Sequence, residues 1–332
     1  MQAKNQKIVV LGTGGTIAGV SASANEGLAY KAAQRGIDDL LDAVLGHQQH
    51  WPEALLDCQF ESEQVAQLDS KDIDFETWIH LAQRCEHWLS HSDVAGLVIT
   101  HGTDTLEETA YFLSQVLSAA KPVVLTCAMR PANFKDADGP QNLRDALLVA
   151  ATTQGLGVYM VAAGEIHHSQ YVQKVHPTRL NAFDSGDTGL AGRVHNDRVQ
   201  WLDTFNTPNT PNTPNTSAKL RVSQLPPATQ WPWVEIVMNH VNASTQHIDA
   251  LVQAGVKGLV VAGTGNGSVS TKLMTSLVLA HKAGVEVRLA TRCNQGVVVP
   301  TENHIFDATG GLSPVKTRVA LLLDMMSQLQ SH

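Results

Sequence analysis

Short apolar runs rich in β-branched residues alternate with segments of helical periodicity along most of this chain. Residues 7–11 (Lys-Ile-Val-Val-Leu) and 94–100 (Val-Ala-Gly-Leu-Val-Ile-Thr) have the composition of strands that are buried on both faces. Helical spacing of apolar residues follows at 37–45, 73–90 and 142–153. Because strands that alternate with helices pair in parallel, the pattern predicts an α/β fold with a mostly parallel sheet flanked by helices.

Two of these predicted strands end in small polar residues directly before a helical pattern begins. Residues 12–19 read Gly-Thr-Gly-Gly-Thr-Ile-Ala-Gly, and residues 100–109 read Thr-His-Gly-Thr-Asp-Thr-Leu-Glu-Glu-Thr. In open α/β sheets, ligands bind at the carboxyl ends of the strands, where backbone N–H groups and short side chains face a crevice. We therefore expect a ligand site at these two strand-to-helix corners.

The composition changes abruptly at residues 206–216, which contain three tandem Thr-Pro-Asn units. Proline cannot supply the N–H groups that a helix interior or a strand ladder needs, so this run predicts an exposed connection. A chain of 332 residues also exceeds what one hydrophobic core usually holds. We expect an N-terminal α/β domain at 1–203, a linker at 204–228 and a smaller C-terminal α/β domain at 229–332. The last segment is expected to have strands at 233–238, 258–262 and 285–290, and helices at 244–254, 271–282 and 315–330.

Charge and composition limit the classes of partner. The formal net charge of −8 argues against nucleic acid or an anionic membrane as a partner, because both require clustered Lys and Arg. A small polar ligand is compatible with it. The first residues contain no apolar leader or membrane span, so the expected compartment is the cytoplasm, with the periplasm as the alternative if the true start lies upstream. The cysteines lack metal-ligand spacing, so we expect no zinc site or disulfide and predict small buried side chains at Cys58, Cys85, Cys127 and Cys293.

The first corner lacks the spacing of a nucleotide-binding turn. Ile17 occupies the third glycine position of a dinucleotide fingerprint, and no phosphate-binding Gly-Lys-Ser/Thr motif occurs at either corner. The corner instead presents the hydroxyl of Thr16 directly after Gly15. Glycine allows a substrate to approach the backbone, and a hydroxyl there can act as a nucleophile. The alternative is that Thr16 only caps the turn that follows.

The second corner places a hydroxyl and a carboxylate side by side, at Thr103 and Asp104. Both can converge on one small ligand, and the carboxylate suits the α-ammonium group of an amino acid. The next four residues, 105–108, match a capping box that would satisfy the free N–H groups of the following helix. For Thr105 and Glu108 a capping role is the preferred interpretation.

Two contiguous motifs carry a resemblance to a known family. Residues 13–19 (Thr-Gly-Gly-Thr-Ile-Ala-Gly) and 99–111 (Ile-Thr-His-Gly-Thr-Asp-Thr-Leu-Glu-Glu-Thr-Ala-Tyr) resemble the two signatures of the bacterial L-asparaginases, within the broader asparaginase/glutaminase amidohydrolases. The similarity continues through shorter motifs at 128–131, 137–143, 262–267 and 310–314. It therefore covers nearly the whole chain.

The resemblance implies hydrolysis of L-asparagine to L-aspartate and ammonia through a threonine acyl-enzyme, with a side activity on L-glutamine. It implies Thr16 as the nucleophile, assisted by Tyr30 of a lid, and a second catalytic group of Thr103, Asp104 and Lys174. The substrate-binding residues implied are Gly15, Ser70, Lys71, Thr103, Asp104, Asn266 and Glu302, of which Asn266 reaches the site of a neighbouring subunit. No metal or organic cofactor is implied, and the assembly implied is a homotetramer built from intimate dimers.

The sequence departs from the family pattern in three places. Lys71 stands where relatives often carry a neutral or acidic residue. The segment 295–309 is shorter than in secreted relatives, so Glu302 matches only loosely the acidic residue that they supply to the lid tyrosine. Residues 119–121 (Ala-Ala-Lys) replace a region that holds a cysteine in some secreted relatives.

Two other functions remain open at the level of sequence. One is a homologue that binds amides without turnover. The other is the asparaginase-like subunit of a transfer-RNA-dependent amidotransferase, which ordinarily carries an additional N-terminal domain.

Overall fold

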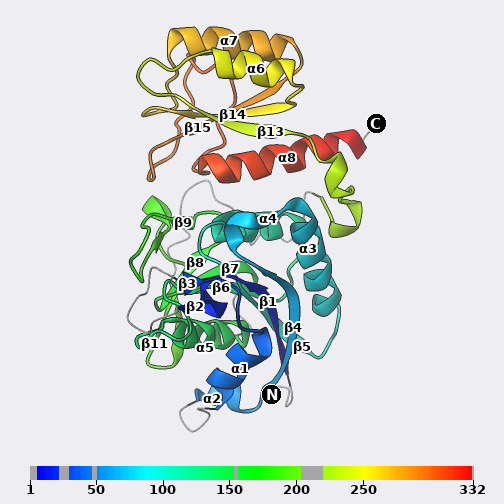
Figure 1. Cartoon of the computed structure of the whole chain (residues 1–332), viewed down its shortest axis with the longest axis vertical. Coiled ribbons are helices and arrows are strands. Elements are labelled where there is room, and N and C mark those ends of the chain that lie inside the picture. Colours follow the sequence, from blue (N-terminus) through cyan, green and yellow to red (C-terminus); the bar gives the residue numbers. More distant parts are fainter. Residues whose placement is uncertain (1–5, 22–29, 47–50, 153–155, 203–219, 331–332) are drawn as a thin grey trace. The chain divides into compact units, whose positions relative to one another are not determined.

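The computed structural model describes residues 6–21, 30–46, 51–152, 156–202 and 220–330. The chain separates into two compact units, Met1–Ser223 and Gln224–His332 (Figure 1). The linker predicted at 204–228 includes the Thr-Pro-Asn run, which lies outside the described residues. Each unit is described here by itself.

The larger unit is built on an eight-stranded sheet with the order β12-β11-β8-β7-β6-β5-β1-β4. The five strands β4, β1, β5, β6 and β7 run parallel, and β8, β11 and β12 add an antiparallel extension. In chain order the strands are β1 (Lys7–Gly14), β4 (Gln59–Leu68), β5 (Val94–Thr100), β6 (Pro122–Thr126), β7 (Gly157–Ala162), β8 (Glu165–His168), β11 (Gly192–His195) and β12 (Arg198–Trp201). The mostly parallel sheet predicted from the sequence is confirmed.

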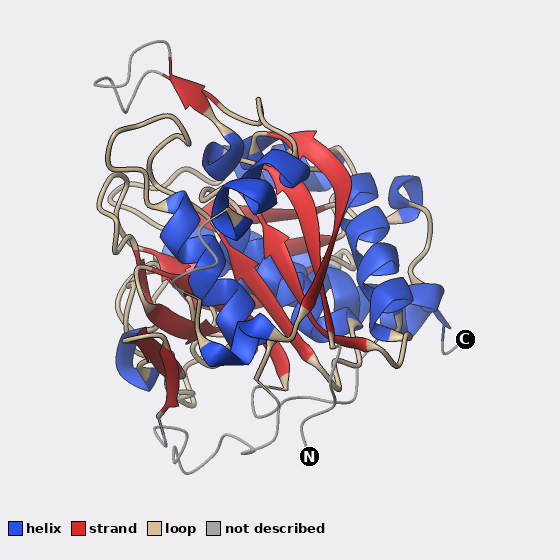
Figure 2. Ribbon diagram, turned by 90° about the horizontal axis from the view of Figure 1, so that it is seen from below, coloured by secondary structure: helices blue, strands red, loops and turns tan. Residues whose placement is uncertain are grey.

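Helices cover both faces of this sheet (Figure 2). On one face, α1 (Ile37–Leu45), α2 (Glu53–Leu56) and α5 (Gly139–Ala150) share a buried core with alternate residues of β1, including Ile8 and Val10. α3 (Phe75–Leu89) and α4 (Leu106–Val116) pack together against the sheet on the other face. Because both faces of β1 are covered, its side chains are apolar without alternation.

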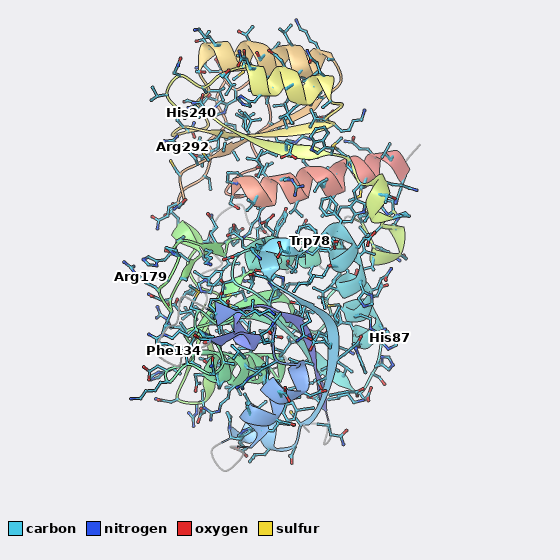
Figure 3. The ribbon with its side chains drawn as sticks, in the orientation of Figure 1. Trp78, His87, Phe134, Arg179, His240 and Arg292 are labelled. Atoms are coloured by element: carbon cyan, nitrogen blue, oxygen red, sulfur yellow. The ribbon has the colours of Figure 1, made fainter. Side chains whose placement is uncertain are left out.

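The packing of α3 on α4 centres on Trp78, which is labelled in Figure 3. Its ring stacks on that of Phe112 with centroids 4.8 Å apart, and its indole N–H donates to Thr109 Oγ1 at 2.9 Å. A buried tryptophan thus has a partner for its polar atom as well as a packing surface. This contact fixes the helix that begins at the second corner.

Short elements project from the carboxyl end of the sheet. β2 (Val20–Ser21) pairs with β3 (Tyr30–Lys31), and β9 (Gln173–Lys174) pairs with β10 (Phe183–Asp184), both antiparallel. Residues 22–29, which precede Tyr30 of the lid implied by the resemblance, lie outside the described residues. Single 3-10 turns described in the larger unit are η1 (Thr16–Ala18), η3 (Ser70–Asp72) and η4 (Gly186–Thr188). η5 (Val222–Gln224) crosses the boundary between the units, and η6 (Ala228–Gln230) belongs to the smaller one.

The smaller unit contains a three-stranded parallel sheet of β13 (Val234–Met238), β14 (Gly258–Gly263) and β15 (Glu286–Thr291). α6 (Gln246–Gln253) and α7 (Thr271–Lys282) form a buried core with one face of it, and α8 (Pro314–Gln330) packs on the other. The strands and helices expected at 233–330 are therefore present with bounds shifted by at most two residues. Among the described helices, none combines the length and the apolar character needed to cross a membrane.

The cysteine prediction holds for two of the four side chains. Cys85 and Cys127 are buried, whereas Cys58 is half-buried and Cys293 is exposed. Burial of Cys293 was the wrong prediction, because the residue follows the end of β15 on an exposed turn rather than the sheet. All four cysteines are free thiols.

Candidate active site

The candidate site lies where four neighbouring parallel strands end. The chain order of the sheet reverses at β1, with β4 on one side and β5 on the other, and β1 is in register with both (Gly12 opposite Gln64 and Thr100). Such a reversal leaves a crevice beyond the carboxyl ends of the strands. The segments that follow β4, β1 and β5 carry Ser70, Thr16 and Thr103 into this region.

The two glycine-containing corners touch through their backbones. Gly15 has φ +80°, and a Cβ placed on it would lie 2.3 Å from both N and Cα of Gly102. The hydroxyl of Thr13 also donates to the carbonyl of Thr100 at 2.8 Å, which ties the ends of β1 and β5 together. A side chain at position 15 would separate the corners, so glycine is required there for two reasons.

A pocket of about 380 Å³ opens between the corners. Its lining residues come from both corners, from the segment that follows β6, and from the regions of β3 and β9: Thr16, Tyr30, Thr103, Asp104, Met129, Arg130, Phe134, Lys174, Pro177 and Thr178. Thr16 is almost fully buried, and its Oγ1 lies 2.6 Å from the hydroxyl oxygen of Tyr30, which is 36% exposed. The first corner thus presents a buried hydroxyl covered by a tyrosine hydroxyl.

The second corner is joined to Lys174 of β9. The Lys174 ammonium donates to Thr103 Oγ1 at 2.8 Å and to Asp104 Oδ1 at 2.6 Å. The lysine side chain is 18% exposed and the aspartate 52% exposed, so the pair faces the pocket rather than the core. These charge-assisted bonds orient the threonine hydroxyl, because its oxygen accepts from the ammonium.

Ser70 supports the second corner from the end of β4. It is buried, and its Oγ accepts a hydrogen bond from the backbone N–H of Asp104 at 3.2 Å. The Thr105 hydroxyl donates to the Ser70 carbonyl at 2.7 Å and makes no capping bond to helix α4. The capping-box prediction for 105–108 was therefore wrong in this respect. A carbonyl from another strand end competes for the hydroxyl that would have capped the helix.

The wall that follows β6 was not predicted from the sequence. The Asp138 carboxylate accepts hydrogen bonds from the backbone N–H groups of Met129 and Arg130, both at 2.9 Å, and from Asn142 Nδ2 at 3.2 Å. The Arg130 guanidinium lies 5.4 Å from the ring centroid of Phe134, which is labelled in Figure 3. The motifs at 128–131 and 137–143 contained the signal, since one supplies the wall and the other its support.

His101 is enclosed next to the second corner. Burial lowers the pKa of its imidazole to about 4, so the ring is neutral at pH 7. Its Nδ1 donates to the Gly102 carbonyl at 2.7 Å, while Nε2 has no hydrogen-bond partner in the part of the chain that the structure describes. The imidazole therefore braces the peptide before Thr103 without contributing charge to the pocket.

Lys71, Asn266 and Glu302 are not among the lining residues of this pocket. Lys71 is exposed and pairs with the carboxylates of Asp69 and Asp72 at 3.1 and 2.7 Å. Asn266 belongs to the smaller unit, where its side-chain amide exchanges two hydrogen bonds with the backbone of Val299 (2.9 and 2.7 Å). Glu302 is exposed on a turn of the same unit.

Gly15 and Ser70 are also absent from the pocket lining, but each contacts the second corner, Gly15 at Gly102 and Ser70 at the Asp104 N–H. Within the described ranges, no three His, Cys, Asp or Glu side chains are grouped to hold a metal ion. A buried hydroxyl beside a tyrosine, and a second hydroxyl held by a lysine, are the components of nucleophilic acyl transfer.

Comparison with known protein families finds a match for each of the two units. Residues 7–207 match the model described as "Asparaginase, N-terminal", and residues 233–330 match "Glutaminase/Asparaginase C-terminal domain". The chain belongs to the asparaginase family. Both matches together span almost all of the described sequence.

Individual relatives align along nearly the full length of the chain. L-asparaginase 2 of Bacillus subtilis is 37% identical over 321 residues, covering 95% of this chain and 81% of that protein. The glutaminase-asparaginase of Pseudomonas fluorescens biotype A is 35% identical over 329 residues, covering 96% and 86%. The crystal structure of a probable cytoplasmic L-asparaginase from Campylobacter jejuni superposes with a TM-score of 0.86 at 33% identity, covering 98% of both chains.

Proposed function

We propose that this asparaginase-family chain hydrolyses the side-chain amide of L-asparagine to L-aspartate and ammonia through an acyl-enzyme on Thr16. The observation that carries the proposal is one pocket lined by both hydroxyl groups, with Tyr30 beside Thr16 and with Lys174 and Asp104 beside Thr103. The relatives named for L-asparaginase activity support the choice of substrate.

The reaction begins with attack of Thr16 Oγ1 on the amide carbon. A C–O bond forms, and the hydroxyl proton passes by way of the Tyr30 hydroxyl, 2.6 Å away, to the amide nitrogen. The C–N bond then breaks and ammonia departs. Water then adds to the ester and gives up a proton, which releases aspartate and restores the threonine hydroxyl. Both steps pass through an oxyanion.

The oxyanion is stabilised by donors at the two corners. Backbone N–H groups there, with Thr103 as the main contributor, supply hydrogen bonds of the kind worth about 3–4 kcal/mol each in other enzymes. Tyr30 closes over the site and excludes bulk water. The Thr103 oxygen accepts from the Lys174 ammonium, so its own O–H points elsewhere, and it donates to Asp104 Oδ1 at 3.5 Å. A substrate oxygen can take the place of this long contact.

Substrate recognition uses the polar groups around the same pocket. Asp104, whose carboxylate is half exposed, binds the α-ammonium group of the substrate. Ser70 Oγ accepts from the Asp104 N–H, so its O–H is available to the α-carboxylate. Gly15 and Lys71 are assigned to substrate binding by the resemblance alone.

Asn266 and Glu302 are assigned, by the resemblance alone, to the site of a neighbouring subunit in a homotetramer of intimate dimers. Sedimentation of the purified chain tests the assembly. The proposed compartment is the cytoplasm, supported by the similarity to the Campylobacter jejuni protein, which is named a probable cytoplasmic L-asparaginase. The periplasm is the alternative, and cell fractionation distinguishes the two.

Ammonia release is the direct test of the reaction. Wild type is expected to release ammonia from L-asparagine, and Thr16→Ala is expected to lose the activity with its fold intact. Equal release by both proteins would show that Thr16 is not the nucleophile. If wild type released none from any amide but bound L-asparagine, an amide-binding role would replace catalysis.

A side activity on L-glutamine is included in the proposal because one relative is named glutaminase-asparaginase. One additional methylene in the substrate changes binding by only about 1–3 kcal/mol. Steady-state kinetics on both amides are expected to give a larger kcat/KM for L-asparagine. A larger value for L-glutamine would reverse the assignment.

A further inference from the structure

The residues at the start of helix α4 bind Lys174 both at its side-chain ammonium and at its backbone N–H. Its ammonium binds Thr103 and Asp104, which directly precede the helix. Its backbone N–H donates to the carboxylate of Glu107 at 3.0 Å, and Glu107 lies in the first turn of α4. Sixty-seven positions along the sequence separate the two residues of this last bond.

The secondary structure around Lys174 gives it little support of its own. β9 consists of two residues, Gln173 and Lys174, and pairs with the equally short β10. The Lys174 N–H is used by Glu107 rather than by that pairing. A side-chain carboxylate on a regular helix therefore fixes the backbone from which the lysine reaches the pocket.

The helix end makes Glu107 suited to this task. α4 is anchored in the core by buried residues, including Leu106 beside Glu107 and Phe112 further along the helix. A carboxylate in the first turn is itself favoured by the helix dipole, so its charge is stabilised while it accepts the bond. Two sets of hydrogen bonds therefore oppose movement of the helix relative to Lys174, one at the lysine backbone N–H and one at its ammonium.

We propose that Glu107 is a positioning residue for the reaction, acting through Lys174 and not on the substrate. This inference rests on the proposed role of Lys174 and goes beyond it. Glu107 does not line the pocket, so its removal is expected to alter turnover by displacing the lysine. Displacement of a catalytic group by about 1 Å can lower the rate by about a hundredfold.

Three substitutions at position 107 separate positioning from charge. Glu107→Ala removes the acceptor and is expected to lower kcat about 10- to 100-fold with KM changed less than about threefold. Glu107→Asp keeps the charge at the helix end but is one methylene shorter, and is expected to lower kcat as well. Glu107→Gln keeps an acceptor oxygen at full length and is expected to retain kcat within about threefold.

Glu108→Ala is the matched control, because it removes the same charge from the same first turn of α4. Its kcat is expected to stay within about twofold of wild type. Thermal unfolding midpoints of all four variants report whether each is folded at the assay temperature. A Glu108→Ala loss equal to that of Glu107→Ala would overturn the proposal, since charge at the helix end would then explain both.

A double-mutant cycle with Lys174→Met gives the decisive comparison. If Glu107 acts through the lysine, Glu107→Ala is expected to cause no further loss of kcat in the Lys174→Met background. A loss of the same size in both backgrounds, or wild-type kcat in Glu107→Ala, would overturn the proposal. Wild-type kcat in Lys174→Met itself would instead refute the proposed catalytic role of Lys174, so the two failures are distinguishable.

Discussion

Two glycine-rich turns follow parallel strands in this protein, one in each unit, and they are used differently. The turn after β1 contributes Thr16 to the pocket, with Gly15 packed against the backbone of Gly102. The turn after β14 closes on itself: a Cβ on Gly263 would lie 2.6 Å from the carbonyl carbon of Gly267. Thr264 and Ser268 also exchange two backbone hydrogen bonds across it, at 2.9 and 2.8 Å.

The difference lies in what each glycine approaches. Gly15 contacts Gly102, which is 87 residues away in the sequence. This contact brings together two hydroxyl groups from different strand ends. Gly263 meets its own turn, so the turn is compact without adding a second set of reactive side chains. A glycine-rich turn after a strand therefore indicates close backbone contact, and the partner in that contact decides whether a site can form.

The largest effect is expected from removing the hydroxyl at the first turn. Thr16→Val should lower kcat at least about a thousandfold, because it deletes the proposed nucleophile while keeping the shape of the side chain. Thr264→Val is the counterpart in the second turn and should keep kcat within about twofold. Stopped assays of ammonia release on both variants provide the measurement. Comparable losses in the two variants would contradict the distinction between the turns.

Adding a methyl group to a glycine tests the contact between the corners. Gly15→Ala should destabilise the fold by more than about 3 kcal/mol, since the new Cβ meets Gly102 and the residue keeps a positive φ. Gly265→Ala also has positive φ, but its new Cβ would meet no atom within 4 Å, so its cost should be about 1 kcal/mol. Urea unfolding gives both values. Equal costs would mean that the approach of the two corners is not tight.

The support of the pocket wall should have a smaller influence on turnover. Asp138→Ala leaves the backbone N–H groups of Met129 and Arg130 without their acceptor, and should lower kcat/KM about 10- to 50-fold. Asn239→Ala is a comparison in the smaller unit, where the amide oxygen accepts from Ser270 N at 3.1 Å. It should affect unfolding more than kcat/KM. A larger loss of kcat/KM in Asn239→Ala than in Asp138→Ala would contradict the assignment of the pocket wall to the segment supported by Asp138.

The smallest effect concerns a scaffold carboxyl of the larger unit. Burial raises the pKa of Asp145 to about 6, against the hydrogen bond from Gln141 and the charge of Arg144, which lower it. The folded state therefore favours the protonated form, and this stabilisation is present below about pH 4 and lost as the pH rises through 6. As the pH is raised from about 4 to 8, the stability of Asp145→Asn relative to wild type should increase by about 2 kcal/mol.

Urea unfolding of wild type and Asp145→Asn across that pH range checks the direction. The activity at about pH 8 should be unchanged within about twofold, because Asp145 lies on α5 and does not line the pocket. A stability difference that is constant with pH would show that the carboxyl does not titrate in this range.

Much of the fold could be predicted because it depends on local pattern. Buried parallel strands such as 94–100 are continuous apolar runs, and α1 repeats its apolar residues at helical spacing. The antiparallel extension was missed because its strands are short and polar: β8 reads Glu-Ile-His-His and β12 reads Arg-Val-Gln-Trp. Their pairing depends on distant neighbours, which local sequence does not reveal.

The site residues also fall into two groups, those that the local sequence pattern indicated and those that it did not. The corner residues Thr16, Thr103 and Asp104 could be singled out from their place after a strand, whereas Tyr30 and Lys174 were assigned only through the resemblance. Asp138 lies in the motif at 137–143, but its role was missed because it accepts from the backbone N–H groups of another segment, a contact that the motif alone does not identify. The capping role expected of Thr105 failed because the carbonyl of Ser70 lies within reach only in the folded chain.

A crystal structure with L-aspartate bound tests the central claim most directly. The account predicts that the side-chain carboxylate of the ligand lies between Thr16 Oγ1 and Thr103 Oγ1, and that its α-ammonium group contacts Asp104. A ligand in contact with only one of the two threonines, or with neither, would contradict it.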